Sequence, residues 1–160
     1  MLYILIVIAI VFTETKIKNY IEDNKKLGEQ EEILNGRIII KKQYNQGMMM
    51  NFLEDKKEMV KTLSGIALGI FLLLFAVMIP RKGNKLFKLG LSLCLGGAIS
   101  NVSDRLNRGY VVDYFSFNCN KLKKIVFNLS DMAIFLGASL IFIASLFPLN
   151  GQSSPNETTE

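Results

Sequence analysis

Uncharged, largely apolar stretches alternate with charged segments along this chain of 160 residues. Asp, Glu, Lys and Arg are absent from residues 1–13, 62–80, 89–103 and 132–156. A helix that crosses the hydrocarbon core of a bilayer needs about 17 to 25 mostly apolar residues, so 62–80 and 132–149 are long enough by themselves. The pattern therefore predicts a membrane protein built from spanning helices.

The other two uncharged stretches are shorter and depend on their flanking residues. Lys16 and Lys18 can extend the first by reaching back to the interface, and Lys88 can do the same for the third, which Leu86 and Phe87 continue. We treat the first stretch as a retained anchor, because no basic residue precedes its apolar run as in a cleaved signal peptide. The prediction is four spans, over about residues 1–13, 62–80, 86–103 and 129–149.

The charged segment 14–61 contains a different pattern. Asn35 and Gly36 favour a tight turn, the run Ile38–Ile40 and Tyr44 favour a strand, and Gly47 follows as a further turn signal. We therefore expect a small β-hairpin outside the membrane. The polar tail 151–160 lacks periodicity and is expected to be disordered, so residues 1–150 form a single predicted domain.

Glycines occur in pairs within two of the predicted spans. Gly65 and Gly69 have the small-xxx-small spacing, and Gly96 and Gly97 are adjacent. Because small residues let helices approach closely in a membrane, both pairs are expected to pack against neighbouring helices.

The charge pattern limits the classes of binding partner, but it does not determine which end of the protein faces the cytoplasm. Nineteen Lys and Arg against fourteen Asp and Glu give a net charge of +5, and the lysines are scattered among acids without a basic stripe. This favours attraction to anionic lipid over nucleic-acid binding. The loop 81–88 is dense in Lys and Arg, which is typical of a cytoplasmic loop, but segment 14–61 is also rich in Lys.

Acidic residues lie at the ends of the predicted spans. Asp104 follows the third span, where the helix dipole disfavours a carboxylate, so an ion-pair cluster with Arg105 and Arg108 is expected. Asp131 opens the fourth span three residues after Asn128, which is a good N-cap residue.

Asp113 lies in an aromatic segment that resembles an interfacial belt, formed by Tyr110, Tyr114, Phe115 and Phe117. A carboxylate among such rings is desolvated, so it needs a partner or a chemical task. Since Asp131 is favoured by its helix N-terminus, we expect it to ionise first and Asp113 to hold a shared proton.

Asp113 and Asp131 belong to the same side of the membrane, because one loop joins the last two predicted spans. Two close carboxylates share one proton, and such a pair can supply both the general base and the general acid of peptide hydrolysis. The chain has no His, and neither Cys94 nor Cys119 has a base partner in the sequence. We therefore expect an aspartic dyad that uses no metal and no cofactor.

The two acid motifs resemble those of the lipoprotein signal peptidases, also called signal peptidase II. That family has approximately GNxxDRxxxGxVVDF followed by FNxAD, and this chain has SNVSDRLNRGYVVDY at Ser100–Tyr114 and FNLSD at Phe127–Asp131. Upstream, the family's NxGAAF is matched at Asn45 and Gly47 alone, and its DQxTK corresponds to ETKIK at Glu14–Lys18.

The resemblance implies a fold, a site and a substrate. The fold class is an all-α membrane protein with four transmembrane helices and a small extracytoplasmic β element, with both termini in the cytoplasm. The implied catalytic residues are Asp113 and Asp131, and the residues that support them or bind substrate are Asn45, Asn101, Arg105 and Asn128. Asp104 is outside the implied pair.

The implied partners are diacylglyceryl-modified prolipoprotein signal peptides and membrane lipid, with no nucleic acid, and the enzyme is expected to be a monomer. It would lie in the bacterial cytoplasmic membrane, with its active site on the extracytoplasmic side. Two alternatives remain: a catalytically silent relative that binds lipidated peptides, and a small transporter. The transporter predicts acids near mid-bilayer, whereas the acids here lie at span ends.

Overall fold

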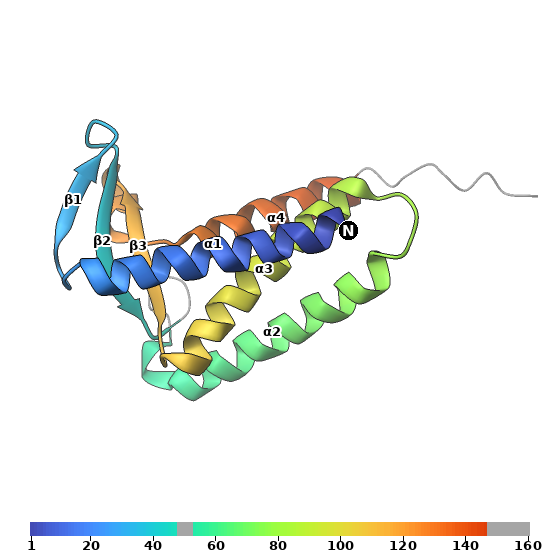
Figure 1. Ribbon diagram of the computed structural model, residues 1–160, viewed down its shortest axis with the longest axis horizontal. Coiled ribbons are helices and arrows are strands. Elements are labelled where there is room, and N and C mark those ends of the chain that lie inside the picture. The colour runs from blue at the N-terminus through green and yellow to red at the C-terminus, as the bar shows by residue number, and fades with distance from the viewer. Residues whose placement is uncertain (48–52, 147–160) are drawn as a thin grey trace, which may run out of the picture.

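The computed structural model describes residues 1–47 and 53–146. The helices α1 (Leu2–Asn24), α2 (Lys57–Met78), α3 (Lys85–Asn107) and α4 (Leu129–Leu146) form a bundle with a small sheet at one end, and the N-terminus and the α2–α3 connection lie at the other (Figure 1). The tail 151–160, predicted to be disordered, and the predicted end of the fourth span at 147–149 lie outside the described residues.

Within the described residues, α2, α3 and α4 are long and apolar enough to cross a membrane. The first helix runs well beyond the predicted span 1–13, because it continues through Glu14, Lys16 and Lys18 without a break. Glu14 and Lys18 are buried against the rest of the molecule, so their charges do not end the helix. That α1 is a fourth span stays a prediction.

The central helix of the bundle is α3, which packs against α1, α2 and α4. Its most apolar window is 67% buried, compared with 6% for α2 and 17% for α4. The side chains of α2 therefore face outward along most of the helix, which suits a helix surrounded by lipid.

Glycines hold α3 and α4 at close range. A Cβ atom at Gly97 would lie 2.5 Å from the carbonyl oxygen of Ser130, and one at Gly137 would lie 2.5 Å from that of Gly90. Real Cβ atoms do not approach backbone this closely, so these positions require glycine. The contact fixes the position of the α4 N-terminus along the axis of α3.

The two glycine pairs singled out in the sequence behave differently. Gly96 faces Ile10 of α1, with 3.0 Å between a built Cβ and the Ile10 Cβ, so the predicted close packing at Gly96 and Gly97 is present. The prediction for Gly65 and Gly69 was wrong, because a Cβ at either position meets no described atom within 4 Å. Both lie on the outward-facing helix α2.

The predicted hairpin is confirmed as β1 (Gln30–Ile33) and β2 (Ile38–Asn45) in antiparallel register. Leu34, Asn35 and Gly36 have positive φ angles of 52°, 56° and 75°, as the turn requires. The short 3₁₀ helices are η2 (Glu54–Lys56), which precedes α2, and η3 (Asn120–Lys124), which precedes α4.

The segment interpreted as an interfacial aromatic belt is a strand, β3 (Val111–Phe117). It pairs antiparallel with β2, and among the described residues the sheet has the order β1-β2-β3. The consecutive residues 111–114 are all buried, so both faces of the strand are covered. For that reason the sequence lacks the polar–apolar alternation that marks a half-exposed strand.

The turn at Gly109, with φ of +80°, sends the chain from α3 into β3. The segment before α4 then runs beside β3, because Phe127 donates its N–H to the carbonyl of Phe115 over 2.7 Å and accepts from Tyr114 over 2.9 Å. This pairing brings the start of α4 to the middle of β3, where Asp113 lies.

Candidate active site

A cavity of about 340 Å³ lies between the sheet and helices α2, α3 and α4. Its apolar wall comes from β3, α4 and the segment that joins them. Its polar wall consists of Asn45, Asn101, Arg105, Asp113 and Asp131. The cavity thus brings together residues of α3, β3 and α4 from the two acid motifs and Asn45 of β2 from the upstream motif.

Asp113 is 2% exposed, and each of its carboxylate oxygens accepts a hydrogen bond from a side-chain amide. Asn128 Nδ2 donates to Oδ1 over 2.7 Å, and Asn45 Nδ2 donates to Oδ2 over 3.0 Å. Both donors are neutral, so they orient the carboxyl group without neutralising a charge.

The two asparagines that hold Asp113 are themselves fixed at their oxygen ends. Asn45 Oδ1 accepts from the N–H of Gly47 over 3.0 Å, and Asn128 Oδ1 accepts from the N–H of Asp131 over 2.9 Å. Because each amide oxygen is engaged by backbone, each amide nitrogen is left to face Asp113.

Asp131 lies in the first turn of α4, and its carboxylate is held from two directions. Asn101 Nδ2 donates to Oδ1 over 2.9 Å, and the backbone N–H of Asn128 donates to Oδ2 over 3.2 Å. With the reverse bond from Asp131 N–H to Asn128 Oδ1, this forms a reciprocal cap. The predicted N-cap is therefore present, and Asn128 contacts both acids.

Burial raises the pKa of Asp113 to about 7, and the nearby carboxylate of Asp131 acts in the same direction. The amides of Asn45 and Asn128 and the charge of Lys18 oppose this shift but do not reverse it. Asp113 can thus keep a proton at neutral pH.

The prediction that Lys18 reaches the membrane interface is wrong, because this cation is buried beside the cavity. Lys18 is 1% exposed, and its Nζ lies 2.8 Å from Asp104 Oδ2 and donates to Asn101 Oδ1 over 3.0 Å and Ser100 Oγ over 3.2 Å. Since Asn101 also donates to Asp131, one amide connects Lys18 to the acid.

Glu14 is also fully buried, and it holds the start of α4 in position. Its carboxylate accepts from the Tyr114 hydroxyl over 2.8 Å and from the N–H of Ser130 over 3.2 Å. The same hydroxyl accepts from the N–H of Leu129 over 3.0 Å. Burial, followed by the charge of Glu14, raises the pKa of Tyr114, so the hydroxyl remains a donor.

Besides their place in the ETKIK segment, one further sequence signal was available for these two residues. Glu14 and Lys18 are four residues apart, which puts them on one face of a helix, and their charged atoms are 3.6 Å apart. An oppositely charged pair with this spacing at the end of an apolar run indicates that this face of the helix points into the protein. The role of Tyr114 had no such signal, because it depends on the pairing of β3 with the start of α4.

The predicted ion-pair cluster at Asp104 is correct for Arg108 and wrong for Arg105. Arg108 Nε lies 3.2 Å from Asp104 Oδ1, and the second carboxylate oxygen pairs with Lys18. Arg105 instead donates to the carbonyl oxygens of Gly47 over 2.8 Å and Asn101 over 3.3 Å. Arg105 therefore holds the chain just beyond the end of β2, and it also lines the cavity.

No cluster of three or more His, Cys, Asp or Glu side chains that could hold a metal ion forms within residues 1–47 and 53–146. The arrangement instead provides two carboxyl groups on one cavity wall, each oriented by neutral N–H donors. Such a pair can take a proton from one reactant and give a proton to another.

A family model, curated relatives and a solved structure each match most of the chain. The family described as Signal peptidase (SPase) II matches residues 6–147. A lipoprotein signal peptidase of Lactobacillus johnsonii is 30% identical over 146 residues, covering 91% of this chain and 92% of that protein. One of Klebsiella pneumoniae is 33% identical over 145 residues, covering 89% and 87%. A solved bacterial membrane enzyme superimposes with a TM-score of 0.80 at 26% identity, covering 97% of this chain and 94% of that one.

Proposed function

The chain belongs to the signal peptidase II family of membrane aspartic peptidases, and on that premise we propose that Asp113 and Asp131 are its catalytic dyad. The substrate is a diacylglyceryl-modified prolipoprotein, from which the enzyme removes the signal peptide before the modified cysteine. The observation that carries the proposal is that both carboxyl groups line one cavity and are oriented by amide and backbone N–H groups.

The reaction needs one ionised and one protonated acid. The ionised carboxylate takes a proton from water, and the water oxygen attacks the scissile carbonyl carbon. The protonated acid donates a hydrogen bond to the carbonyl oxygen as it becomes negatively charged. When the C–N bond breaks, a proton passes to the leaving amine of the modified cysteine. The raised pKa of Asp113 supports its role as the group that holds the proton before attack.

Asn45, Asn101 and Asn128 act as positioning residues in this proposal. Each donates from Nδ2 to a dyad oxygen and is fixed at its own Oδ1. This holds the acids in place before substrate arrives, so little reorganisation is needed during the reaction. Arg105 places a positive charge at the cavity wall, where it attracts the developing oxyanion and the substrate backbone.

The acyl chains of the substrate remain in lipid while the peptide enters the cavity. Helices α2 and α4 both contribute to the cavity lining and are mostly exposed along their apolar windows, which supports a position of the acyl chains against them. Unmodified precursor lacks this anchor and is expected to be refused.

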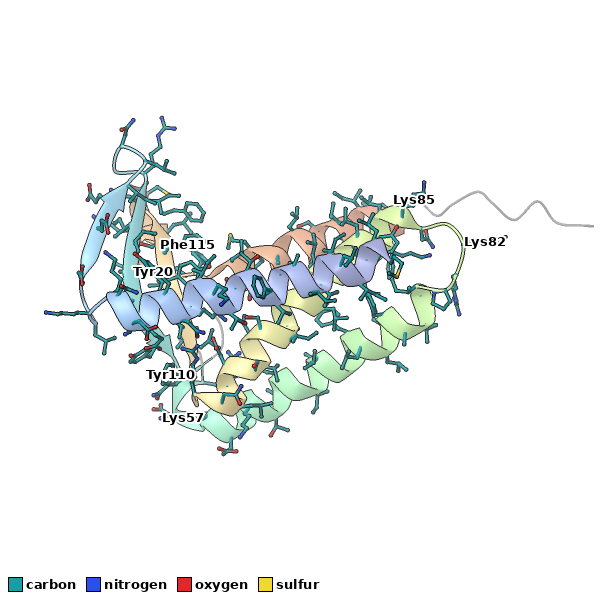
Figure 2. All side chains as sticks on the ribbon, in the orientation of Figure 1. Tyr20, Lys57, Lys82, Lys85, Tyr110 and Phe115 are labelled. Carbon is teal, nitrogen blue, oxygen red and sulfur yellow. The ribbon has the colours of Figure 1, made fainter. Side chains whose placement is uncertain are left out.

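The sheet end of the bundle faces the extracytoplasmic side of the bacterial cytoplasmic membrane, and α1 completes four spans in a monomer. The opposite end carries the α2–α3 connection with Arg81, Lys82 and Lys85, and Figure 2 labels the last two there. Clustered positive charge in a short loop supports a cytoplasmic location for that end.

The test is cleavage by purified protein in detergent of a diacylated prolipoprotein and of the same precursor without the lipid, followed by gel shift. We expect cleavage of the lipidated form alone. Asp113→Asn and Asp131→Asn should each abolish cleavage, because a side-chain amide can act neither as the general base nor as the proton donor of this reaction.

Asp23→Asn is the matched control, because Asp23 is an exposed acid on α1 outside the cavity. It should retain wild-type activity. Turnover by either dyad variant would overturn the assignment of the acids. Binding of lipidated precursor without cleavage by wild type would identify a catalytically silent relative.

A further inference from the structure

A second cavity, of about 280 Å³, lies beside the active site between the start of α2 and the end of α3. Lys57 and Lys61 enter it from α2, and Arg105 and Arg108 from α3. Figure 2 shows Lys57 and Tyr110, which both line this cavity, near the sheet end of the bundle. We name it the basic pocket.

Positive charge in the basic pocket exceeds the negative charge that faces it. Arg108 is paired with both Asp104 and Glu22, but among the described residues Lys57 and Lys61 form no ion pair. Glu58 is the acid that lines the pocket. Such a surplus of cations fits an anion.

The surroundings indicate which anion fits. Beyond Lys61, the helix α2 exposes apolar side chains, with Leu63, Ile66 and Ile70 exposed by 40%, 56% and 54%. Helix α2 is also long and apolar enough to cross the membrane. A molecule with an anionic head and acyl chains matches both features, because its head meets the cations and its chains lie along α2. An acidic peptide side chain would use the cations alone.

We propose that the basic pocket binds the phosphate group of an anionic phospholipid, with the acyl chains against the exposed face of α2. Lys57, Lys61 and Arg105, which form no ion pair among the described residues, attract such a lipid, since each basic residue near an anionic surface contributes separately. Because Arg105 lines both this pocket and the active-site cavity, the bound headgroup lies directly beside the dyad.

Binding is measured without any cleavage, so the result is independent of the proposed peptidase mechanism. Delipidated protein in a neutral detergent is titrated with dihexanoyl phosphatidylglycerol, dihexanoyl phosphatidylcholine, glycerol phosphate or an acidic peptide, and the Tm is recorded. A ligand that binds the folded state raises the Tm in a concentration-dependent way. We expect phosphatidylglycerol to raise the Tm and phosphatidylcholine to have little effect.

The variant Lys57→Gln/Lys61→Gln removes two pocket charges, and Lys82→Gln/Lys85→Gln removes two charges from the opposite end of the bundle (Figure 2). The pocket variant should bind phosphatidylglycerol at least about tenfold more weakly, whereas the control should bind as wild type does. If the pocket variant does not fold, Lys57→Arg/Lys61→Arg keeps the charges and should retain binding.

Equal responses to the two phospholipids, or equal affinity of the pocket variant and wild type, would overturn the proposal. An effect of the acidic peptide without one of phosphatidylglycerol would also overturn it and assign the pocket to peptide. A response to glycerol phosphate weaker than that to phosphatidylglycerol supports the contribution of the acyl chains, and an equal response contradicts it.

Discussion

The ammonium group of Lys18 donates to Oδ1 of Asn101 over 3.0 Å, and this contact determines which way the Asn101 amide faces. The oxygen must point toward the cation, so Nδ2 points toward Asp131 and donates to it over 2.9 Å. Lys18 therefore orients an acid that it does not itself contact. Its positive charge also opposes the rise in the pKa of Asp113.

Replacing Lys18 with Met should lower both stability and turnover. Glu14 would be left buried without its cation, and Asp104 would lose one of its two cations and keep Arg108. Breaking a buried pair costs about 3 to 5 kcal/mol. The Asp113 carboxylate also loses an attractive charge, so its pKa should rise and the alkaline limb of the rate profile should move to higher pH. Thermal unfolding and a pH–rate profile measure the two effects.

Lys16→Met is the control for this experiment, because Lys16 is exposed on the same helix. We expect a change in unfolding free energy within about 0.5 kcal/mol. An unshifted alkaline limb in a folded Lys18→Met enzyme would show that Lys18 has no electrostatic influence on the dyad.

The pH dependence of the wild type should follow Asp113. Its pKa is raised to about 7, so the acid that must hold a proton loses it near that pH and kcat should fall above it. Burial disfavours the charged form, so the folded protein binds this proton more tightly than the unfolded chain does. Stability from this group is full below about pH 4 and is lost as pH rises to about 7.

Asp113→Asn removes this titration and allows the stability prediction to be measured directly. As the pH rises from about 4 to about 7, the free energy of unfolding of the variant should increase relative to that of wild type by up to about 4 kcal/mol. Above about pH 7 the difference should stay constant. Unfolding curves over that range give the difference. A constant difference at all pH values would mean that Asp113 titrates at its ordinary pKa.

Glu14 and Tyr114 should be energetically coupled, since the hydroxyl donates to the carboxylate over 2.8 Å in a buried position. Tyr114→Phe leaves a Glu14 oxygen and the N–H of Leu129 without this partner, which costs about 1 to 3 kcal/mol. In a double-mutant cycle with Glu14→Gln, we expect a coupling energy of about 0.5 to 3 kcal/mol. Tyr20→Phe is the control, because Tyr20 is 62% exposed, and strict additivity would argue against the pair.

Gly97→Ala should impair the enzyme more than Gly65→Ala. The new methyl group at Gly97 would lie 2.5 Å from the carbonyl of Ser130 and would push the start of α4 away from α3. Overpacking of this kind costs about 1 to 3 kcal/mol, and it displaces Asp131 from Asn101. Gly65→Ala enters open space and should be neutral or slightly stabilising, because alanine favours helix. Thermal unfolding and cleavage rates measure both variants, and equal effects would contradict the packing argument.

Several structural features of this protein can be predicted from local sequence alone. The uncharged stretches predict helices because the hydrocarbon core excludes charge over a fixed thickness. Asn35 and Gly36 predict a hairpin because they accept positive φ angles, and Asn128 predicts a helix start because its side chain accepts an early backbone N–H. Each property depends on residues within one or two turns of chain.

The resemblance named the candidate dyad and, beside it, Asn45, Asn101, Arg105 and Asn128, but the sequence did not predict what these side chains contact. Arg105 was assigned to its neighbour Asp104, whereas it reaches Gly47, 58 residues away in the chain. Lys18 bonds to Asn101 across a separation of 83 residues, and Tyr114 to Glu14 across 100. A sequence pattern gives no preference among such distant partners, since many charged and polar side chains are chemically equivalent.

The tertiary structure decided which charges are buried and where the strand β3 pairs. Val112 and Tyr114 pack against Ile21 of α1, whereas Val111 and Asp113 line the cavity together with residues of α3 and α4. Both faces of this segment are therefore buried, and its sequence shows no strand periodicity. Likewise, Glu14 and Lys18 become part of the site because α1 packs along α3 and beside β3. From the sequence alone one can predict which segments are apolar enough to cross a membrane and which acids lie at their ends, whereas packing in the folded chain fixes what each acid touches.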